Sequence, residues 1–282
     1  MSRGLSVLAA VIAAFSTATP YHVRTLSFVD RTRAIVLPSG AREARPIRTV
    51  VRYPTTPGRH PLIVFAHGFA LVPGAYAALL DAWARAGYVV AAPVFPLTNA
   101  HAPGGPNESD LINQPRDVSV VISRLVALGS RPHGVLAGRI DPDRIAVAGQ
   151  SDGGVTALAA AYDPRFRDSR IRAAVVLSGA LLGGMGAFPR RGPPLLAMQG
   201  TADTINPPSA TEAYFDLAHR PKFLVWLVGA EHLPPYTTEQ PQLSVVERAT
   251  LAFLGHYLLG RPLAALSAAA HRPGITRFIS QP

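Results

Sequence analysis

The sequence predicts an α/β fold in which helices cover both faces of a mostly parallel central sheet. Two observations support this prediction. Short apolar segments alternate along the chain with longer segments of helical character, as parallel strands joined by helices require. The apolar segments also lack the strict alternation of apolar and polar residues that a half-exposed strand shows, which indicates burial on both faces of the sheet.

This pattern gives the elements in chain order. The expected central strands are Leu62–Ala66, Tyr88–Ala92, Ile145–Ala148, Ala173–Leu177, Leu195–Met198 and Phe223–Val228. The expected helices are Tyr76–Ala86, Asp117–Leu128, Gly153–Ala161, Ala210–Ala218 and Val245–Leu259. Pro115 and Asp117 support the start of the second helix, because proline and acidic residues are favoured in a first helical turn. Near the N-terminus, Val23–Val29 and Ile47–Tyr53 are expected to be antiparallel edge strands.

The 282 residues contain no internal repeat and no linker, which favours one domain over residues 19–282. Two stretches rich in proline and glycine, Pro93–Pro106 and Gly183–Pro194, are expected to be loops above the carboxyl ends of the strands, where open α/β sheets bind ligands. The connection from Leu177 to Leu195 is short. We therefore expect a small cap or none, and a comparatively open cleft.

The first residues have the organisation of a secretory signal peptide. Arg3 supplies a positive charge, Leu5–Phe15 is apolar, and Ser16-Thr17-Ala18 offers small residues for cleavage. We assign residues 1–18 to a signal peptide and expect a protein that is secreted or located in the periplasm or cell envelope. An N-terminal membrane anchor is the alternative, although the apolar segment is shorter than the roughly 20 residues that span a bilayer.

The chain carries a formal net charge of +10, from 27 Lys and Arg residues against 17 Asp and Glu residues. The basic residues are scattered and no aromatic stripe interleaves with them, so we expect no nucleic-acid partner. A peripheral contact with a membrane or polymer surface is compatible with this charge. The histidines are dispersed and form no metal-ligand pattern, so we expect no metal and no cofactor.

The segment Gly149-Gln150-Ser151-Asp152-Gly153 is the most informative part of the chain for its chemistry. It follows the apolar run Arg144–Ala148 and precedes a stretch of small residues, so it is expected to be a sharp turn from strand to helix, a nucleophile elbow. The flanking glycines allow the backbone to cross itself closely. Ser151 is therefore the candidate nucleophile of a serine hydrolase.

A serine nucleophile of this kind is followed along the chain by an acid and then by a histidine, each after a strand. Asp203 follows the apolar segment Leu195–Met198, and His232 follows Phe223–Val228. Among the nine histidines, only His232 combines a loop at the end of a strand with the right place in the order. Asp203 is the candidate orienting acid and His232 the candidate general base.

The reaction also needs donors for the oxyanion of a tetrahedral intermediate. The backbone amides of Phe69 and Asp152 are the candidates, because Phe69 follows an early strand and Asp152 begins a helix. The ring of His67 is expected to make structural hydrogen bonds and not to act as a second base. The residues expected to line the substrate site are Phe69, Ala70, Leu71 and Gln150.

Several segments together resemble the α/β-hydrolase superfamily, and within it esterases with a small cap: dienelactone hydrolase, plasma-type platelet-activating-factor acetylhydrolase and cutinase-like polyester hydrolases. The resemblance covers about Arg45–Gly260, and the segments that carry it are Tyr53-Pro54, Phe65–Phe69, Ile140–Ser151, Gly200–Asp203 and Gly229–His232. Similar elbows often have His before the serine and Met or Leu after it, where this chain has Gln150 and Asp152.

The resemblance implies a carboxylic ester hydrolase that acts through a Ser-His-Asp triad and an acyl-enzyme, on small or lipid-like esters. Two alternatives stay open. An acyltransferase would use the same triad and deliver the acyl group to an alcohol. A binding protein without catalytic activity could also be built on this fold, although such proteins usually lose a member of the triad.

Overall fold

The structure is a computed structural model that describes residues 18–182, 188–189 and 192–282. Its strands are β1 Tyr21–Val36, β2 Arg42–Pro54, β3 His60–Ala66, β4 Val89–Val94, β5 Ile140–Gln150, β6 Ile171–Leu177, β7 Leu195–Gly200, β8 Lys222–Leu227 and β9 Thr276–Gln281. Its helices are α1 Ala77–Arg85, α2 Gln114–Gly129, α3 Asp152–Tyr162, α4 Pro208–Leu217, α5 Pro234–Thr237, α6 Gln242–Leu259 and α7 Ala264–Ala270. Short 3-10 helices are η1 Pro73–Tyr76 and η2 Glu108–Asn113.

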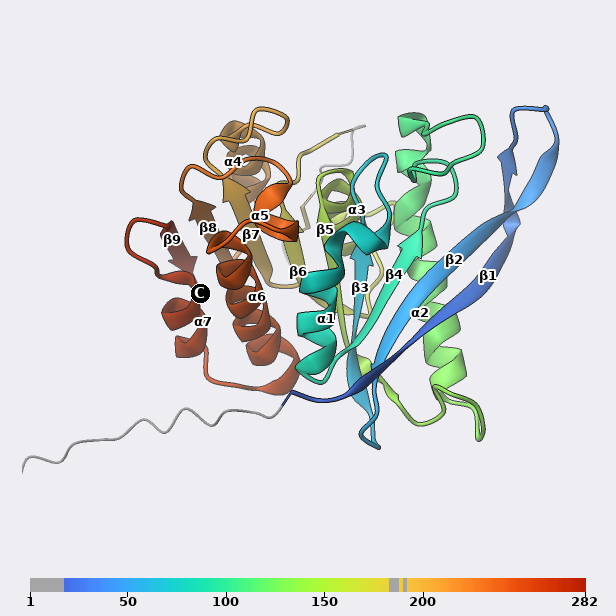
Figure 1. The fold of residues 1–282 in the computed structure, drawn as a ribbon, viewed down its shortest axis with the longest axis horizontal. Helices are drawn as coiled ribbons and strands as arrows, with labels where there is room; N and C mark the ends of the chain where they lie inside the picture. The colour runs from blue at the N-terminus through green and yellow to red at the C-terminus, as the bar shows by residue number, and fades with distance from the viewer. Residues whose placement is uncertain (1–17, 183–187, 190–191) are drawn as a thin grey trace, which may run out of the picture.

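All the strands of the described residues belong to one sheet. Its strands follow the order β1-β2-β4-β3-β5-β6-β7-β8-β9, and helices lie on both of its faces (Figure 1). The strands from β3 to β8 pair in parallel, whereas β1, β2 and β9 pair antiparallel with their neighbours. The predicted α/β architecture is therefore confirmed.

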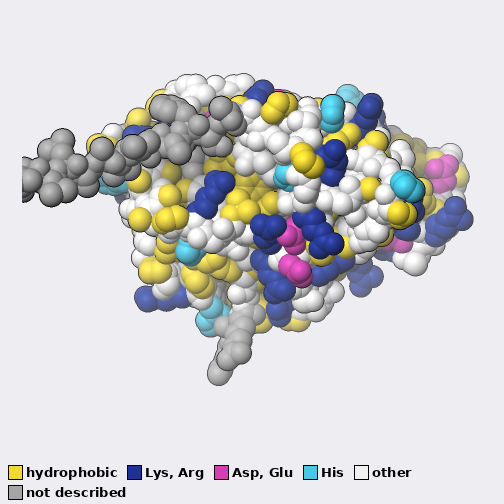
Figure 2. Space-filling model, turned by 90° about the horizontal axis from the view of Figure 1, so that it is seen from below, with side chains coloured by type: hydrophobic (Ala, Val, Ile, Leu, Met, Phe, Trp, Pro, Cys, Tyr) yellow, Lys and Arg dark blue, Asp and Glu magenta, His cyan; other side chains and the backbone are white. Residues whose placement is uncertain are grey.

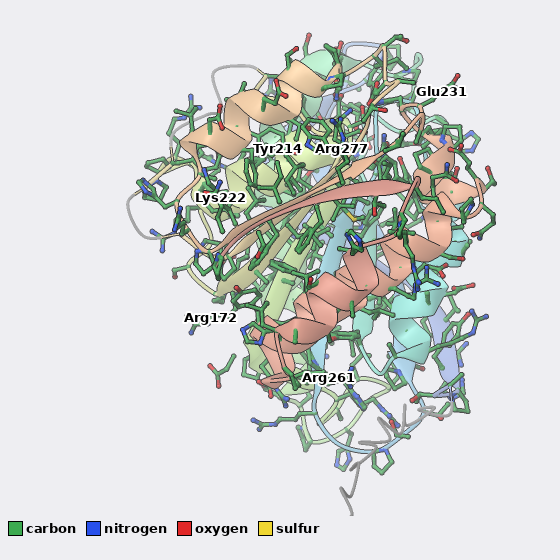
Figure 3. All side chains as sticks on the ribbon, turned by 90° about the vertical axis from the view of Figure 1, so that its left-hand side faces the viewer. Arg172, Tyr214, Lys222, Glu231, Arg261 and Arg277 are labelled. Carbon is green, nitrogen blue, oxygen red and sulfur yellow. The ribbon has the colours of Figure 1, made fainter. Side chains whose placement is uncertain are left out.

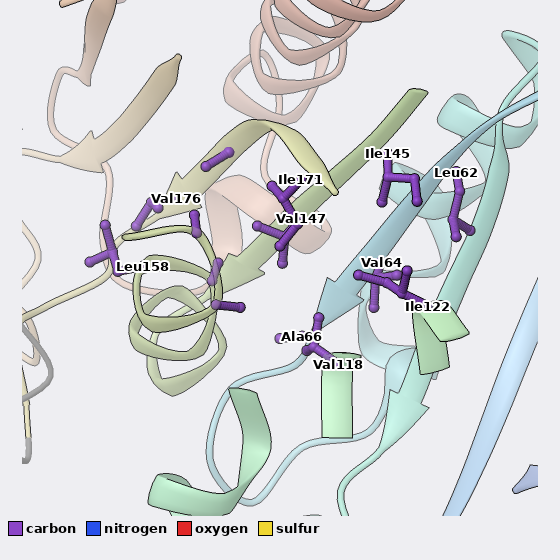
Figure 4. Packing of buried hydrophobic residues seen from close by; sticks show 14 of the residues in the cluster. Leu62, Val64, Ala66, Val118, Ile122, Ile145, Val147, Leu158, Ile171 and Val176 are labelled. Carbon is purple, nitrogen blue, oxygen red and sulfur yellow. The ribbon is translucent and has the colours of Figure 1, made fainter. Parts of the chain in front are cut away.

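Successive side chains of a central strand enter two different hydrophobic clusters, one on each face of the sheet. In β3, Leu62, Val64 and Ala66 join the cluster that contains residues of α2 and α3. Ile63 and Phe65 join the cluster that contains residues of α1 and α6. Figure 4 shows the first cluster, in which side chains of α2 and α3 pack against β3, β5 and β6. Because both faces are buried, the strand sequences are continuously apolar.

The edges of the sheet differ from the prediction. The antiparallel pairing of the first two strands is as expected, but β1 extends well beyond Val29, and β2 pairs on both sides and is not an edge strand. The second edge is β9, which the sequence did not predict. This strand is short and largely polar, so it lacks the apolar run by which the central strands were recognised.

Two predictions fall on residues outside the described ranges. The predicted signal peptide, residues 1–18, is described only at Ala18, and the predicted loop Gly183–Pro194 is described only at residues 188–189 and 192–194. Both the signal peptide and the small cap therefore stay predictions. Among the helices in the described ranges, none has the length and hydrophobicity to cross a bilayer.

Arg45 is the centre of a buried ion network that joins β2 to η2 and α2. Its side chain is 1% exposed, and its guanidinium group makes a two-point contact with Asp110, at 2.9 and 2.6 Å. It also donates hydrogen bonds of 2.7 Å to each carboxylate oxygen of Asp117. Arg33 of β1 adds a 2.6 Å bond to the same carboxylate. The network fixes η2 and the start of α2 against the sheet.

Arg45→Met is expected to lower the free energy of unfolding by about 3–5 kcal/mol, because two buried carboxylates lose their main partner. Arg144→Met is the matched control: Arg144 is 37% exposed in its pair with Asp141, and such pairs contribute less than about 1 kcal/mol. Urea unfolding followed by circular dichroism at neutral pH measures both. Equal losses in the two variants would contradict a structural role for the Arg45 network.

Candidate active site

Ser151 lies in the turn between β5 and α3, where the sequence placed it. Its backbone has a φ of 56° and a ψ of −124°, a strained conformation that is typical of a nucleophile elbow. Close backbone contacts require the flanking glycines. A Cβ atom on Gly149 would lie 1.9 Å from the carbonyl oxygen of Gly153, and one on Gly153 would lie 2.0 Å from that of Ala66. Any side chain at either position would force the turn apart.

Asp203 and His232 lie in the loops after β7 and β8 and meet Ser151 at the carboxyl ends of the strands. Nδ1 of His232 is 2.7 Å from Oδ2 of Asp203, and Nε2 is 2.8 Å from Oγ of Ser151. Because an ionised carboxylate only accepts hydrogen bonds, Nδ1 carries the ring proton and Nε2 is free to accept the serine proton. The structure thus brings the three predicted residues into one hydrogen-bonded chain.

The side chain of Asp203 is fully buried, and several donors hold its carboxylate. Oδ1 accepts hydrogen bonds from the amides of Ile205 and Asn206 at 3.0 and 2.9 Å, and Oδ2 accepts one from Nε2 of Gln199 at 3.0 Å. Burial alone would raise the pKa of Asp203, but the hydrogen bond and charge of His232 and the amide of Asn206 outweigh burial and hold this pKa below its usual value. Asp203 is therefore ionised at neutral pH.

The two predicted oxyanion donors are amides without an acceptor in the described part of the chain. Asp152 is the first residue of α3, where amides have no helical acceptor. Phe69 borders the same cleft as Ser151, and both of its neighbours are fixed: the amide of Gly68 donates to the hydroxyl of Tyr76, and that of Ala70 donates to a backbone carbonyl. The amide of Phe69 is therefore presented by a firmly held loop.

A cleft of about 350 Å³ opens beside Ser151 and His232. The residues predicted to line a substrate site, Phe69, Ala70, Leu71 and Gln150, all border this cleft. Two further apolar residues, Ile205 and Leu233, complete its wall. Ile205 is 69% exposed and therefore forms part of the rim. Apart from the catalytic candidates and Gln150, the cleft is apolar.

Some basic side chains lie far from the loop that carries His232. Figure 3 shows Glu231, the neighbour of His232, at one end of the molecule and Arg172 and Arg261 toward the other end. Figure 2 shows the molecule from below the view of Figure 1, and on this side Lys and Arg side chains gather around a few acidic ones. Within the described ranges, no Lys or Arg lines the cleft. The described wall of the cleft therefore carries no Lys or Arg charge next to the candidate nucleophile.

His67 is buried and has the structural role expected of it. The amide of Phe95 donates to Nε2 of His67 at 3.2 Å, so Nδ1 carries the ring proton and donates to the carbonyl oxygen of Gly68 at 2.8 Å. Burial lowers the pKa of this imidazole to about 4, which keeps the ring neutral. The ring ties the loop after β3 to the end of β4.

Comparison with known protein families identifies the family of the chain. The model of the chlorophyllase family matches residues 21–208, more than half of the chain, from β1 to the start of α4. The chain belongs to the chlorophyllase family. This is an esterase family of the α/β-hydrolase superfamily, so the resemblance to that superfamily is confirmed. The range that matches chlorophyllase contains Ser151 and Asp203 and ends before His232. None of the curated proteins compared with the chain matches it.

Around the site of this chlorophyllase-family chain, the structure adds Gln199 to the residues found from sequence. Its side chain is fully buried, its Oε1 accepts a 2.7 Å hydrogen bond from Thr211, and its Nε2 donates to the Asp203 carboxylate. Gln199 therefore helps to hold the candidate acid. The sequence feature that could have indicated Gln199 is its position as a polar residue in the otherwise apolar strand Leu195–Gly200.

Asp152 is the second unexpected feature, because its side chain is 5% exposed and its Oδ2 makes no hydrogen bond within the described residues. Burial raises the pKa of this carboxyl to about 6. The negative charge of Glu108 also raises this pKa, whereas the charge of His232 lowers it. An unpaired carboxylate beside the nucleophile costs stability when it is ionised.

Asp152→Asn is expected to stabilise the protein at pH 8 and to leave its stability nearly unchanged at pH 4. In the unfolded chain this carboxyl has a pKa near 3.8, whereas burial raises its pKa to about 6 in the folded protein. The folded protein therefore loses stability as the pH rises between these two values. The gain at pH 8 should reach up to about 3 kcal/mol, since each pKa unit corresponds to about 1.4 kcal/mol. Urea unfolding at both pH values measures it. A variant less stable than the parent at pH 8 would contradict the unpaired state.

Proposed function

We propose that the chain is a serine carboxylic ester hydrolase that acts through Ser151, His232 and Asp203 and a covalent acyl-enzyme. The observation that carries this proposal is the hydrogen-bonded chain from Asp203 through His232 to Ser151, at 2.7 and 2.8 Å, at a strained turn beside an apolar cleft. Membership of an esterase family supports an ester as the substrate.

In the first half of the proposed reaction, Nε2 of His232 takes the proton of the Ser151 hydroxyl while Oγ attacks the ester carbonyl carbon. The carbonyl oxygen becomes an oxyanion that accepts hydrogen bonds from the amides of Phe69 and Asp152. As the intermediate collapses, the imidazolium gives its proton to the leaving alcohol oxygen. The ionised Asp203 stabilises the imidazolium while it exists.

In the second half, a water molecule gives a proton to Nε2 of His232 and attacks the acyl carbon. The same two amides hold the second oxyanion. When the bond to Oγ breaks, the imidazolium returns the proton to Ser151 and the carboxylic acid leaves. The enzyme is then ready for another ester.

The cleft favours esters with apolar groups. Phe69, Leu71, Ile205 and Leu233 line it, and burial of an apolar group there is favourable by roughly 25 cal/mol per Å² of surface removed from water. We therefore propose small or lipid-like esters as substrates. The part of a larger ester that extends beyond the cleft would pass the side chain of Ile205, which is exposed at the rim.

The test is labelling with a fluorophosphonate followed by peptide mass spectrometry, together with turnover of p-nitrophenyl esters of increasing acyl length. We expect one label per chain, on Ser151, and turnover of at least one ester. Chlorophyll belongs in the panel of substrates because the family is named for an enzyme that acts on it. Absence of a label on Ser151, or of any ester turnover, would overturn the proposal.

A further inference from the structure

Three loops of the proposed active site are joined by a chain of hydrogen bonds that the reaction itself does not use. The amide of Gly68 donates to the hydroxyl of Tyr76 at 3.1 Å, and this hydroxyl donates to Oε1 of Gln150 at 2.7 Å. Nε2 of Gln150 then donates to the backbone carbonyl oxygen of His232 at 3.0 Å. Tyr76 and Gln150 are both fully buried.

We propose that Tyr76 and Gln150 are positioning residues that keep the oxyanion donor and the base aligned with Ser151. This inference rests on the proposed function. Gly68 directly precedes Phe69, whose amide is the proposed donor. Gln150 directly precedes the nucleophile, and the last acceptor belongs to the base His232. We call the pair of side chains the Tyr76–Gln150 clamp.

The packing around the clamp leaves little freedom for any of its members. A Cβ atom on Gly68 would lie 2.8 Å from Oε1 of Gln150 and 3.1 Å from the hydroxyl of Tyr76, so a side chain at this position would displace the Gln150 amide from its contact with Tyr76. The ring of Tyr76 packs against Phe65 of β3, with ring centroids 4.8 Å apart. Burial raises the pKa of the Tyr76 hydroxyl, which therefore stays protonated and remains a donor.

The hydrogen bonds of the clamp also show whether Gln150 aligns the elbow or recognises a substrate. The residue borders the cleft, but its Oε1 already accepts a hydrogen bond from Tyr76 and its Nε2 already donates one to the carbonyl of His232. A substrate that used either atom would have to break a buried hydrogen bond, and a buried polar group left without a partner is costly. Gln150 therefore serves the alignment of the elbow and not the recognition of a substrate.

The test compares Tyr76→Phe with Tyr88→Phe. Both substitutions remove one buried phenol hydroxyl, but the hydroxyl of Tyr88 has no hydrogen-bond partner within the described residues. Tyr76→Phe should lower kcat on a p-nitrophenyl ester roughly 10- to 100-fold, the size of effect that a misplacement of about 1 Å produces. Its KM should stay within a factor of about 3, because the lost alignment acts on the transition state. Tyr88→Phe should leave both constants unchanged.

A double-mutant cycle with Gln150→Met checks that the two residues act as one unit. Methionine has a similar length but can link neither Tyr76 nor His232. The double variant Tyr76→Phe/Gln150→Met should lose no more kcat than the worse single variant, since non-additivity indicates a shared role. If Tyr76→Phe does not fold, Gln150→Met is compared with Tyr88→Phe in the same assay.

The outcomes separate this inference from the proposed function. Fluorophosphonate labelling of Ser151 in the parent protein tests the proposed function alone. If the parent is labelled and active, an unchanged kcat in Tyr76→Phe, or losses in the double variant that multiply, would overturn the clamp. Equal losses of kcat in Tyr76→Phe and Tyr88→Phe would overturn it as well, because they would reflect general packing.

Discussion

Ser151→Ala is expected to lower kcat on a soluble p-nitrophenyl ester by about 10⁶-fold, because no atom remains to form the acyl-enzyme. The fold should be retained, since the Ser151 side chain makes only the 2.8 Å hydrogen bond to His232 within the described residues. Steady-state kinetics at neutral pH measure the loss, and the midpoint of thermal unfolding confirms that the variant is folded.

His232→Ala is the companion variant for Ser151. Nucleophile and base act as one unit, so the loss in His232→Ala should be of the same order, and the double variant should be no less active than either single one. A Ser151→Ala variant that keeps a tenth of the parental kcat would show that the hydrolysis takes place elsewhere.

Asp203→Asn is expected to lower kcat by about 10⁴-fold while KM changes little. The asparagine oxygen can accept the hydrogen bonds from the backbone of Ile205 and Asn206, and the NH2 group then lies beside Nδ1 of His232, where the carboxylate had an acceptor oxygen. The ring would lose the negative partner that stabilises its protonated form, and the donor orientation would favour the wrong tautomer. Steady-state kinetics on the same ester measure this loss.

The matched control for Asp203→Asn is Asp216→Asn, a change of the same kind on the exposed surface of α4. Its kcat should equal that of the parent. Comparable losses in the two variants would argue that net charge, and not the contact with His232, explains the effect.

Much of the fold could be predicted because its signals are local. The central strands are apolar throughout, since residues such as Ile63 and Val64 face separate clusters on the two sides of the sheet. The positions of Ser151, Asp203 and His232 could be predicted because each follows a strand and parallel strands end at one edge. Topology then brings together three residues that are distant in sequence.

The remaining features depend on contacts between distant segments. Tyr76 looks like one more apolar residue at the start of a helix, and only its hydroxyl, which reaches Gln150 across 74 positions of sequence, gives it a role. The edge strand β9 is held by pairing with β8, and its own sequence is largely polar. The unpaired carboxylate of Asp152 likewise follows from the burial of its surroundings and not from its neighbours in sequence.

Ile205 combines two properties that bear on protein engineering. Its side chain lies at the exposed rim of the cleft, while its hydrogen bond to Asp203 comes from its backbone amide. Any residue except proline supplies that amide. Substitutions of Ile205 can therefore change the substrate preference while they keep the hydrogen bond that holds the Asp203 carboxylate. Leu233, on the same wall, offers a second position for such diversification. We therefore expect that the substrate selectivity of the proposed hydrolase changes by exchange of a few rim side chains.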